Sequence, residues 1–282
     1  MPCTLPRQTS KRTLKLDNSA ANTFAFCPRL FQEKYRFHTQ KKTPGDARAF
    51  GKRIHDLLKA HFLELKGELW VPPILDPDDP VELEAQEMIE AYRAFYPVED
   101  FDVVEVEQYF EIPIPDSPHT YCGKRDGVVR GRNTGRLRLL EHKSEKRGQK
   151  SNLPKVWAAR SQVGLYLFSA QQFYGEPFED IILDVLTRRS PAGRILPEFR
   201  RDNLQRSQQQ IEKAVENLRA IANRIQEYDE TYGLAPWPEF TENCCKGGFD
   251  CDFYGLHVQC EGKRIPEYME KYYEPTEDYL SL

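Results

Sequence analysis

Apolar side chains recur at helical spacing in several stretches of this chain. The clearest stretch is residues 48–66, where apolar positions follow one another three or four residues apart. Residues 203–232 repeat the pattern over a longer segment. Together with shorter apolar and aromatic segments, the sequence predicts helices at 18–37, 48–66, 81–95, 155–174 and 203–232.

Between these helices the pattern changes to the alternation that is typical of strands. Residues 103–113 alternate clearly, and further strands are expected at 120–130, 136–143 and 180–187. The element order, with three strands before a helix and a fourth strand after it, indicates a mixed sheet flanked by helices. We therefore predict an α/β fold with a four-stranded mixed sheet.

The second and third strands carry the most informative polar residues. They are joined by Gly131-Arg132-Asn133-Thr134-Gly135, and a hairpin centred there places Asp126 directly opposite Glu141 and Val128 opposite Leu139. Because side chains alternate along a strand, Lys143 shares the face of Glu141 and His142 points the other way. Two carboxylates and an ammonium then converge, which predicts a site for a hard cation such as Mg²⁺. The alternative is a salt-bridged hairpin.

Bulk composition fits a soluble globular protein. Hydrophobic residues make up 39% of the 282 positions and charged residues 30%. The polar, basic N-terminus has no apolar core typical of a secretory signal, and no apolar run approaches the ~18 residues of a membrane span. We expect a cytoplasmic protein with no membrane partner.

Positive charge is concentrated despite the net charge of −4. Residues 142–160 hold six Lys or Arg against one acid, and residues 188–206 hold six Arg against two acids. Such stretches suit a phosphate backbone, although an ordinary solvated surface has the same composition.

Seven cysteines occur, at positions 3, 27, 122, 244, 245, 251 and 260. An odd count without an export signal argues against a disulfide scaffold. Four of them lie within 17 residues near the C-terminus, which suggests metal ligation.

These motifs together resemble the PD-(D/E)XK nuclease superfamily. Gly123-Lys124-Arg125-Asp126-Gly127 and Leu140-Glu141-His142-Lys143 resemble its motifs II and III. Gly51-Lys52-Arg53-Ile54-His55 and Gln162-x-x-x-Tyr166 are similar to motifs of the RecB-like branch. Cys27-Pro28-Arg29-Leu30-Phe31 and the late cysteines resemble the iron–sulfur members, including CRISPR-associated adaptation nucleases and AddB-type nucleases.

The resemblance implies a restriction-endonuclease-like core and roles for individual residues. Asp126, Glu141 and His55 would hold Mg²⁺ or Mn²⁺, and Lys143 would assist attack by water. Gln162 and Tyr166, one helical turn apart, would contact DNA or order the lysine. The alternatives are a packed histidine, a solvated lysine, and an ordinary packed tyrosine beside a solvated glutamine. Glu107 could add an acidic side chain from the preceding strand, whereas His61 is expected to be structural.

The cysteines extend the resemblance. Cys27, Cys245, Cys251 and Cys260 would ligate a [4Fe–4S] cluster, with Cys244 as the alternative to Cys245. The spacing of the late cysteines departs from the Cys-x-x-Cys of the adaptation nucleases. Four-thiolate zinc and unligated buried thiols remain alternatives.

The expected organisation follows from these assignments. Residues 1–17 form a flexible basic arm, residues 18–262 a single nuclease domain with a cysteine subregion at 18–37 and 233–262, and residues 263–282 an acidic tail that could dock a protein partner. The expected function is that of a metal-dependent DNA nuclease, more specifically a single-strand exonuclease in repair, recombination, or phage or defence processing. Its expected substrates are single strands or DNA ends. Alternatives are a non-catalytic nucleic-acid-binding scaffold subunit and a restriction-type endonuclease.

Overall fold

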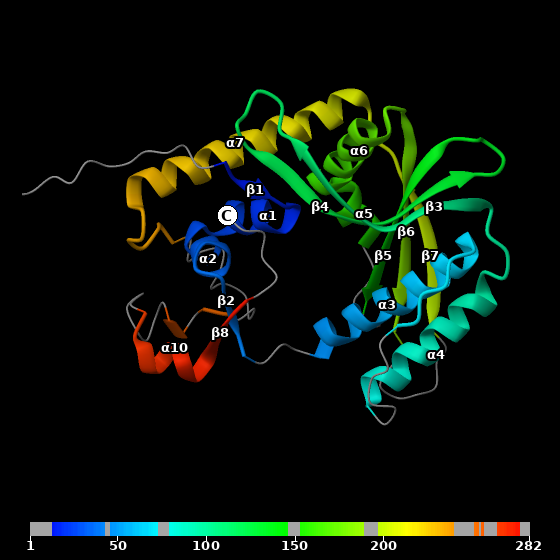
Figure 1. The fold of residues 1–282 in the computed structure, drawn as a ribbon, viewed down its shortest axis with the longest axis horizontal. Helices are drawn as coiled ribbons and strands as arrows, with labels where there is room; N and C mark the ends of the chain where they lie inside the picture. The colour runs from blue at the N-terminus through cyan, green and yellow to red at the C-terminus, as the bar shows by residue number, and fades with distance from the viewer. Residues whose placement is uncertain are drawn as a thin grey trace, which may run out of the picture. The chain divides into compact units, whose positions relative to one another are not determined.

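The computed structural model describes residues 13–42, 46–72, 79–145, 153–188, 197–239, 251–253, 255–256 and 264–276 (Figure 1). The chain divides into two compact units. The larger unit comprises Pro44–Phe110 and Lys124–Val215, and the smaller comprises Met1–Thr43, Glu111–Gly123 and Glu216–Leu282. None of the helices in the described ranges has the length and apolar character needed to cross a membrane.

A mixed sheet is the centre of the larger unit. Its strands are β3 (Phe101–Pro113), β4 (Thr120–Gly131), β5 (Leu137–Glu145), β6 (Phe178–Thr187) and β7 (Glu198–Leu204). Strand β4 pairs with β3 and β5, β5 runs parallel to β6, and β6 runs antiparallel to β7. The predicted mixed α/β fold is therefore confirmed. Within the described residues the sheet has six strands rather than four, because β7 joins one edge and the short β1 (Lys15–Leu16) pairs with β4.

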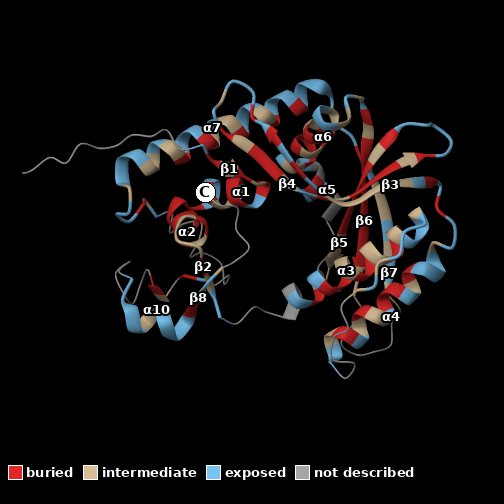
Figure 2. Ribbon diagram, viewed as in Figure 1, coloured by how far each residue is buried: buried red, intermediate tan, exposed pale blue. Residues whose placement is uncertain are grey.

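Helices cover both faces of this sheet. Helices α3 (Asp46–Lys66) and α4 (Pro80–Phe95) pack on the face that presents Val129, Leu140 and Ile182. Helices α5 (Leu153–Ala159), α6 (Ser161–Tyr174) and the start of α7 (Gln208–Tyr232) pack on the opposite face. Figure 2 shows the central strands as largely buried. Because most of the apolar side chains of β5 and β6 are removed from water on both faces, the hydrophobic effect fixes these two strands most firmly.

The smaller unit contains short elements. These are β1, α1 (Asn18–Phe26), α2 (Pro28–Phe31), η1 (Gln32–Arg36), β2 (Thr39–Lys41), α10 (Pro266–Tyr272) and β8 (Tyr273–Pro275). Strands β2 and β8 pair antiparallel. Residues from both ends of the sequence share one apolar cluster, which includes Cys27, Cys251 and Phe253.

Three predicted helices differ from the structure. The helix expected at 18–37 is interrupted at Cys27, which is extended because Pro28 disfavours helical backbone in the residue before it. The helix expected at 155–174 breaks at Arg160, whose backbone is also extended. The helix expected from residue 203 begins at Gln208, since the preceding residues pair with β6 as β7.

Candidate metal centre

The β4–β5 hairpin sets the geometry of the candidate site. Gly127 pairs with Leu140 and Val128 with Leu139, which confirms the register expected from the sequence. Continuing that register by one pair places Asp126 opposite Glu141. The backbone N–H of His142 donates a hydrogen bond to Asp126 Oδ2 over 2.8 Å, so the strand itself orients the Asp126 carboxylate.

Three possible metal ligands converge from three elements. His55 comes from α3, Glu107 from β3 and Asp126 from β4, and their ligand atoms all lie within 4.8 Å of one another. His55 Nδ1 lies 3.6 Å from Asp126 Oδ1 and 3.8 Å from Glu107 Oε1. One imidazole and two carboxylates form a donor set that suits Mn²⁺ or Mg²⁺, because both cations accept carboxylate oxygen.

Glu107 reaches this group through an unusual backbone conformation. Its φ of +54° lies in the left-handed region, which is costly for a residue other than glycine. Such a residue interrupts the regular alternation of a strand and redirects its side chain. The carboxylate faces His55 with one oxygen and pairs with the ammonium of Lys124 through the other.

Glu141 and Lys143 form a second pair next to Asp126. Lys143 Nζ lies 2.6 Å from Glu141 Oε1, and the Glu141 side chain is almost fully buried. Burial and then the nearby Asp126 carboxylate raise the pKa of Glu141 to about 7. Lys143 offsets part of the negative charge of these two neighbouring carboxylates, and a bound cation would offset more of it.

The pKa values of His55, Lys143 and Glu107 are also shifted, because carboxylates and nitrogen groups lie close together in this site. Burial alone would lower the pKa of His55, but Asp126 and Glu107 outweigh it and raise that pKa. Burial likewise opposes charge on Lys143, yet Glu141 and Asp126 raise the pKa of the ammonium. For Glu107, burial is outweighed by hydrogen bonds from His55 and Lys124, which lower its pKa.

Trp157 packs beside this pair and was not recognised from the sequence. The residue is buried on α5, and its ring lies 5.0 Å from Lys143 Nζ and 5.3 Å from the guanidinium carbon of Arg160. A cation over an aromatic face is stabilised by the ring quadrupole. The signal was available, since Trp157 is the one tryptophan in the basic stretch 142–160.

The predicted Gln162–Tyr166 pair lies on α6. The Tyr166 hydroxyl donates a hydrogen bond to the Lys124 carbonyl over 3.4 Å, and its ring lies 6.2 Å from that of Phe110. Tyr166 is thereby attached to β4 two residues before Asp126. Gln162 is half-buried one turn earlier.

His142 lies on β5 and His61 on α3, and both rings pack against aromatic side chains. The sequence predicted that His142 points away from the site. Its ring packs 5.1 Å from Phe62, but it also lies 6.3 Å from the His55 ring, and His142 Nδ1 is 3.8 Å from Asp126 Oδ2. Burial, followed by the positive charge of His55, lowers the pKa of His142 well below its usual range. For His61, burial and then Arg93 lower the pKa to about 4, so the ring is neutral at physiological pH.

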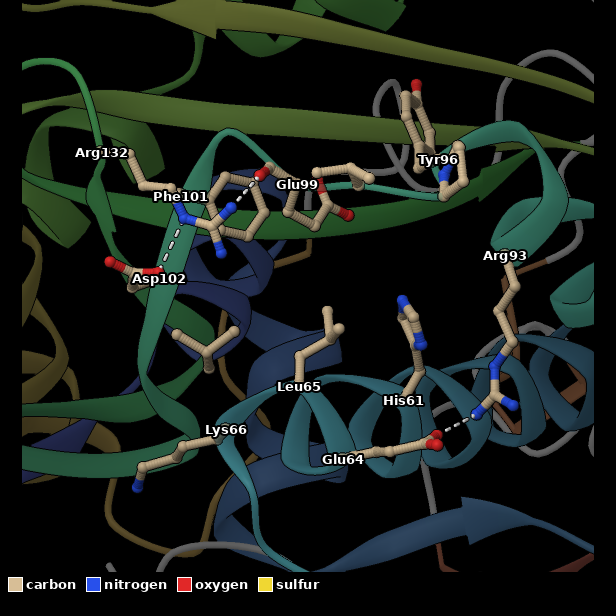
Figure 3. Close-up of a pocket in the computed structure, with 13 residues that line it drawn as sticks. His61, Glu64, Leu65, Lys66, Arg93, Tyr96, Glu99, Phe101, Asp102 and Arg132 are labelled. Carbon is tan, nitrogen blue, oxygen red and sulfur yellow. Dashed lines mark hydrogen bonds and ion pairs between the residues drawn. The ribbon is translucent and has the colours of Figure 1, made fainter.

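His61 also lines a separate pocket of about 590 Å³, drawn in Figure 3. Two arginines of its wall are already paired with acids. Arg93 contacts Glu64 over 3.1 Å and Arg132 contacts Asp102 over 2.8 Å. These paired charges do not provide an open phosphate site.

Of the arginines in the basic stretch 188–206 that the structure describes, three are already paired with acids. Arg188 pairs with Glu84, Arg200 pairs with Asp202, and Arg201 is held by Glu99 and Asp184. Arg206 is half-buried and donates a hydrogen bond to the Arg160 carbonyl over 3.4 Å. Arg160 and Arg206 therefore lie together on the side of the larger unit that carries Trp157.

The predicted cysteine ligands are placed only in part. Cys27 and Cys251 are buried in the same apolar cluster of the smaller unit, with Phe253 and Leu256. Cys245 and Cys260, together with the alternative Cys244, lie outside the described residues.

Comparisons with known proteins agree with this architecture. Residues 18–253 match the family model described as the PD-(D/E)XK nuclease superfamily. A crystal structure from Eubacterium rectale, described as "Putative exonuclease", is similar in fold with a TM-score of 0.53 and 12% identity, covering 91% of this chain and 92% of that chain. The structure of SSO0001 matches with a TM-score of 0.35 and 16% identity over 73% of this chain and 83% of that chain. No curated protein matches the sequence.

Proposed function

Because the chain belongs to the PD-(D/E)XK nuclease superfamily, we propose that it is a RecB-like DNA nuclease that hydrolyses phosphodiester bonds with Mg²⁺ or Mn²⁺. The convergence of His55, Glu107 and Asp126 beside the Glu141–Lys143 pair is the observation that carries this proposal. A bound divalent cation supplies Lewis-acid stabilisation of the phosphodiester.

The ligands in this proposal are His55, Asp126 and Glu141, with Glu107 as an additional ligand. His55 offers a ring nitrogen at the edge of the group, and the two strands present the carboxylates at adjacent positions. Removing any one carboxylate reduces the negative charge that attracts the cation. The protein contributes preorganisation, because Asp126 is already fixed by the His142 N–H.

Lys143 acts as a cation in this mechanism. Its carboxylate neighbours raise its pKa, so the side chain carries an ammonium at neutral pH. An ammonium donates hydrogen bonds, orients the attacking water and stabilises charge that develops on the phosphate. Trp157 restricts the lysine to the site by packing against it. Gln162 and Tyr166 contact the DNA backbone or order β4, and Arg160 and Arg206 extend the phosphate-binding surface.

Nuclease activity is tested with purified protein, labelled single- and double-stranded DNA, and Mn²⁺ or Mg²⁺. The proposal predicts cleavage by the wild type and loss of cleavage in Asp126→Asn and Lys143→Ala. Lys66→Ala is the matched control, since Lys66 is an outlying lysine that pairs with Glu68 and Glu105. DNA binding without cleavage under either cation would favour the scaffold function instead.

The proposed substrate is a DNA end, with single strands preferred. This follows from the RecB-like motifs, His55 and the Gln162–Tyr166 pair. An exonuclease degrades linear single-stranded DNA and leaves closed circular single-stranded DNA intact. Cutting of the circular substrate would identify an endonuclease.

We further propose that Cys27, Cys245, Cys251 and Cys260 hold a [4Fe–4S] cluster, with four-thiolate zinc as the alternative. Support comes from Cys27 and Cys251, which are far apart in sequence yet buried in one cluster. Thiolate ligation between distant segments stabilises a small unit because it joins them covalently through the metal. Anaerobically purified protein should absorb broadly near ~400 nm, and Cys27→Ser should lose that band. A colourless protein that contains zinc would contradict the cluster without affecting the nuclease proposal.

A further inference from the structure

Lys124 forms an ion pair with Glu107 at the edge of the candidate metal centre. The two side chains differ in burial, since Glu107 is 10% exposed and Lys124 is 59% exposed. Glu107 therefore has a fixed place in the site, whereas the lysine approaches it from the solvent side.

The two oxygens of Glu107 have different partners. Oε1 faces His55 and Oε2 faces Lys124, so the carboxylate is enclosed by two nitrogen groups. The left-handed backbone at Glu107 holds the carboxylate in this position. A carboxylate that is largely buried and ionised needs a positive partner, and Lys124 is the full cation among its described contacts.

We propose that Lys124 is an internal counter-ion of Glu107. Its ammonium pairs with the carboxylate to which a divalent cation would bind, and it has to leave before the cation binds there. Lys124 thereby lowers the metal affinity of the free enzyme. This inference rests on the proposed metal centre. A divalent cation bound by Glu107 repels an ammonium on the same carboxylate. The largely exposed lysine can return to water at little cost, because its charge is then fully hydrated.

Lys143 provides the contrast within the same site. Its side chain is less exposed than that of Lys124 and pairs with Glu141 while its ammonium lies against Trp157. Lys143 is therefore held at the centre, whereas Lys124 has no comparable packing among the described contacts. The two lysines have separate roles, with Lys143 in the reaction and Lys124 in metal loading.

The experiment measures the Mn²⁺ dissociation constant of the full chain without DNA, by titration calorimetry or by the electron paramagnetic resonance signal of free Mn²⁺. Lys124→Gln should bind Mn²⁺ about fivefold more tightly than wild type, a modest gain because a half-exposed ion pair is weak. Lys124→Arg keeps the charge and should stay within about twofold of wild type. Lys66→Ala is the matched control, since it removes a lysine from Glu105 on the same strand, and it should also leave the affinity unchanged.

A double-mutant cycle separates the ion pair from a general charge effect. In a Glu107→Gln background, Lys124→Gln should give no further gain in affinity. Equal or weaker binding by Lys124→Gln, or the same gain in the Glu107→Gln background, would overturn the inference while the metal centre stands. If wild type shows no saturable Mn²⁺ binding, the proposed function fails and this inference fails with it. Lys124→Met, which retains the aliphatic stem, replaces Lys124→Gln if circular dichroism shows that the glutamine variant is misfolded.

Discussion

Glu141→Gln should stabilise the metal-free protein at alkaline pH although it removes a proposed ligand. The pKa of Glu141 is raised from 4.5 to about 7 by burial and then by Asp126. The folded state therefore binds a proton more tightly than the unfolded state, and stability falls as pH rises from about 4.5 to about 7. Glutamine resembles the protonated carboxyl and avoids this loss.

The size of the effect follows from the shift. Each pKa unit corresponds to about 1.4 kcal/mol, so the shift of Glu141 amounts to roughly 3 kcal/mol at pH 8. At pH 5 most of the difference in stability between Glu141→Gln and wild type disappears, because the wild-type carboxyl is then protonated in the folded state.

The assay is urea unfolding of both proteins in EDTA at pH 5 and pH 8, followed by circular dichroism. Glu227→Gln on α7 is the control, since Glu227 is exposed and should change stability little at either pH. With saturating Mn²⁺ the order reverses, because wild type gains binding free energy that the variant has lost. Glu141→Gln that is less stable than wild type at pH 8 in EDTA would refute the electrostatic reasoning.

Three further predictions test neighbouring residues. Lys143→Ala should reduce kcat by about 10²- to 10³-fold without weakening Mn²⁺ binding, and a matching loss of Mn²⁺ affinity would contradict its assigned role. Arg201→Met should lower the free energy of unfolding by about 3–5 kcal/mol, because it leaves the buried carboxylates of Glu99 and Asp184 unpaired; a loss below about 1 kcal/mol in urea would argue against that network. Tyr166→Phe should change the free energy of unfolding by less than about 1 kcal/mol, since the hydrogen bond of Tyr166 to the Lys124 carbonyl is long. The same variant should bind single-stranded DNA about fivefold more weakly in Ca²⁺. Unchanged affinity would remove Tyr166 from the DNA-binding surface.

The hairpin was predictable because its information is local. A turn centred between Asn133 and Thr134 fixes the register of both strands, and one slipped residue would have moved Val128 out of the core. The place of Asp126 opposite Glu141 followed from that register. The helices α3 and α4 were equally predictable from the sequence, since their apolar stripes follow helical spacing over several turns.

Other features depended on tertiary contacts that no local pattern contains. Glu107 was only a minor candidate, because the left-handed backbone that brings it to His55 interrupts the alternation of β3. Strand β7 was not predicted because charged residues such as Arg200 and Asp202 give its sequence the composition of an exposed segment. Its conformation is determined by pairing with β6 and by the burial of Arg201.

Anomalous diffraction from crystals soaked in Mn²⁺ tests the central claim most directly. The proposed function predicts a manganese peak about 2.2 Å from a carboxylate oxygen of Asp126 and from a ring nitrogen of His55, with Glu107 or Glu141 completing the ligands. The same peak should be absent from Asp126→Asn crystals. A wild-type protein that cleaves DNA with Mn²⁺ but binds the ion away from Asp126 and His55 would contradict the assignment.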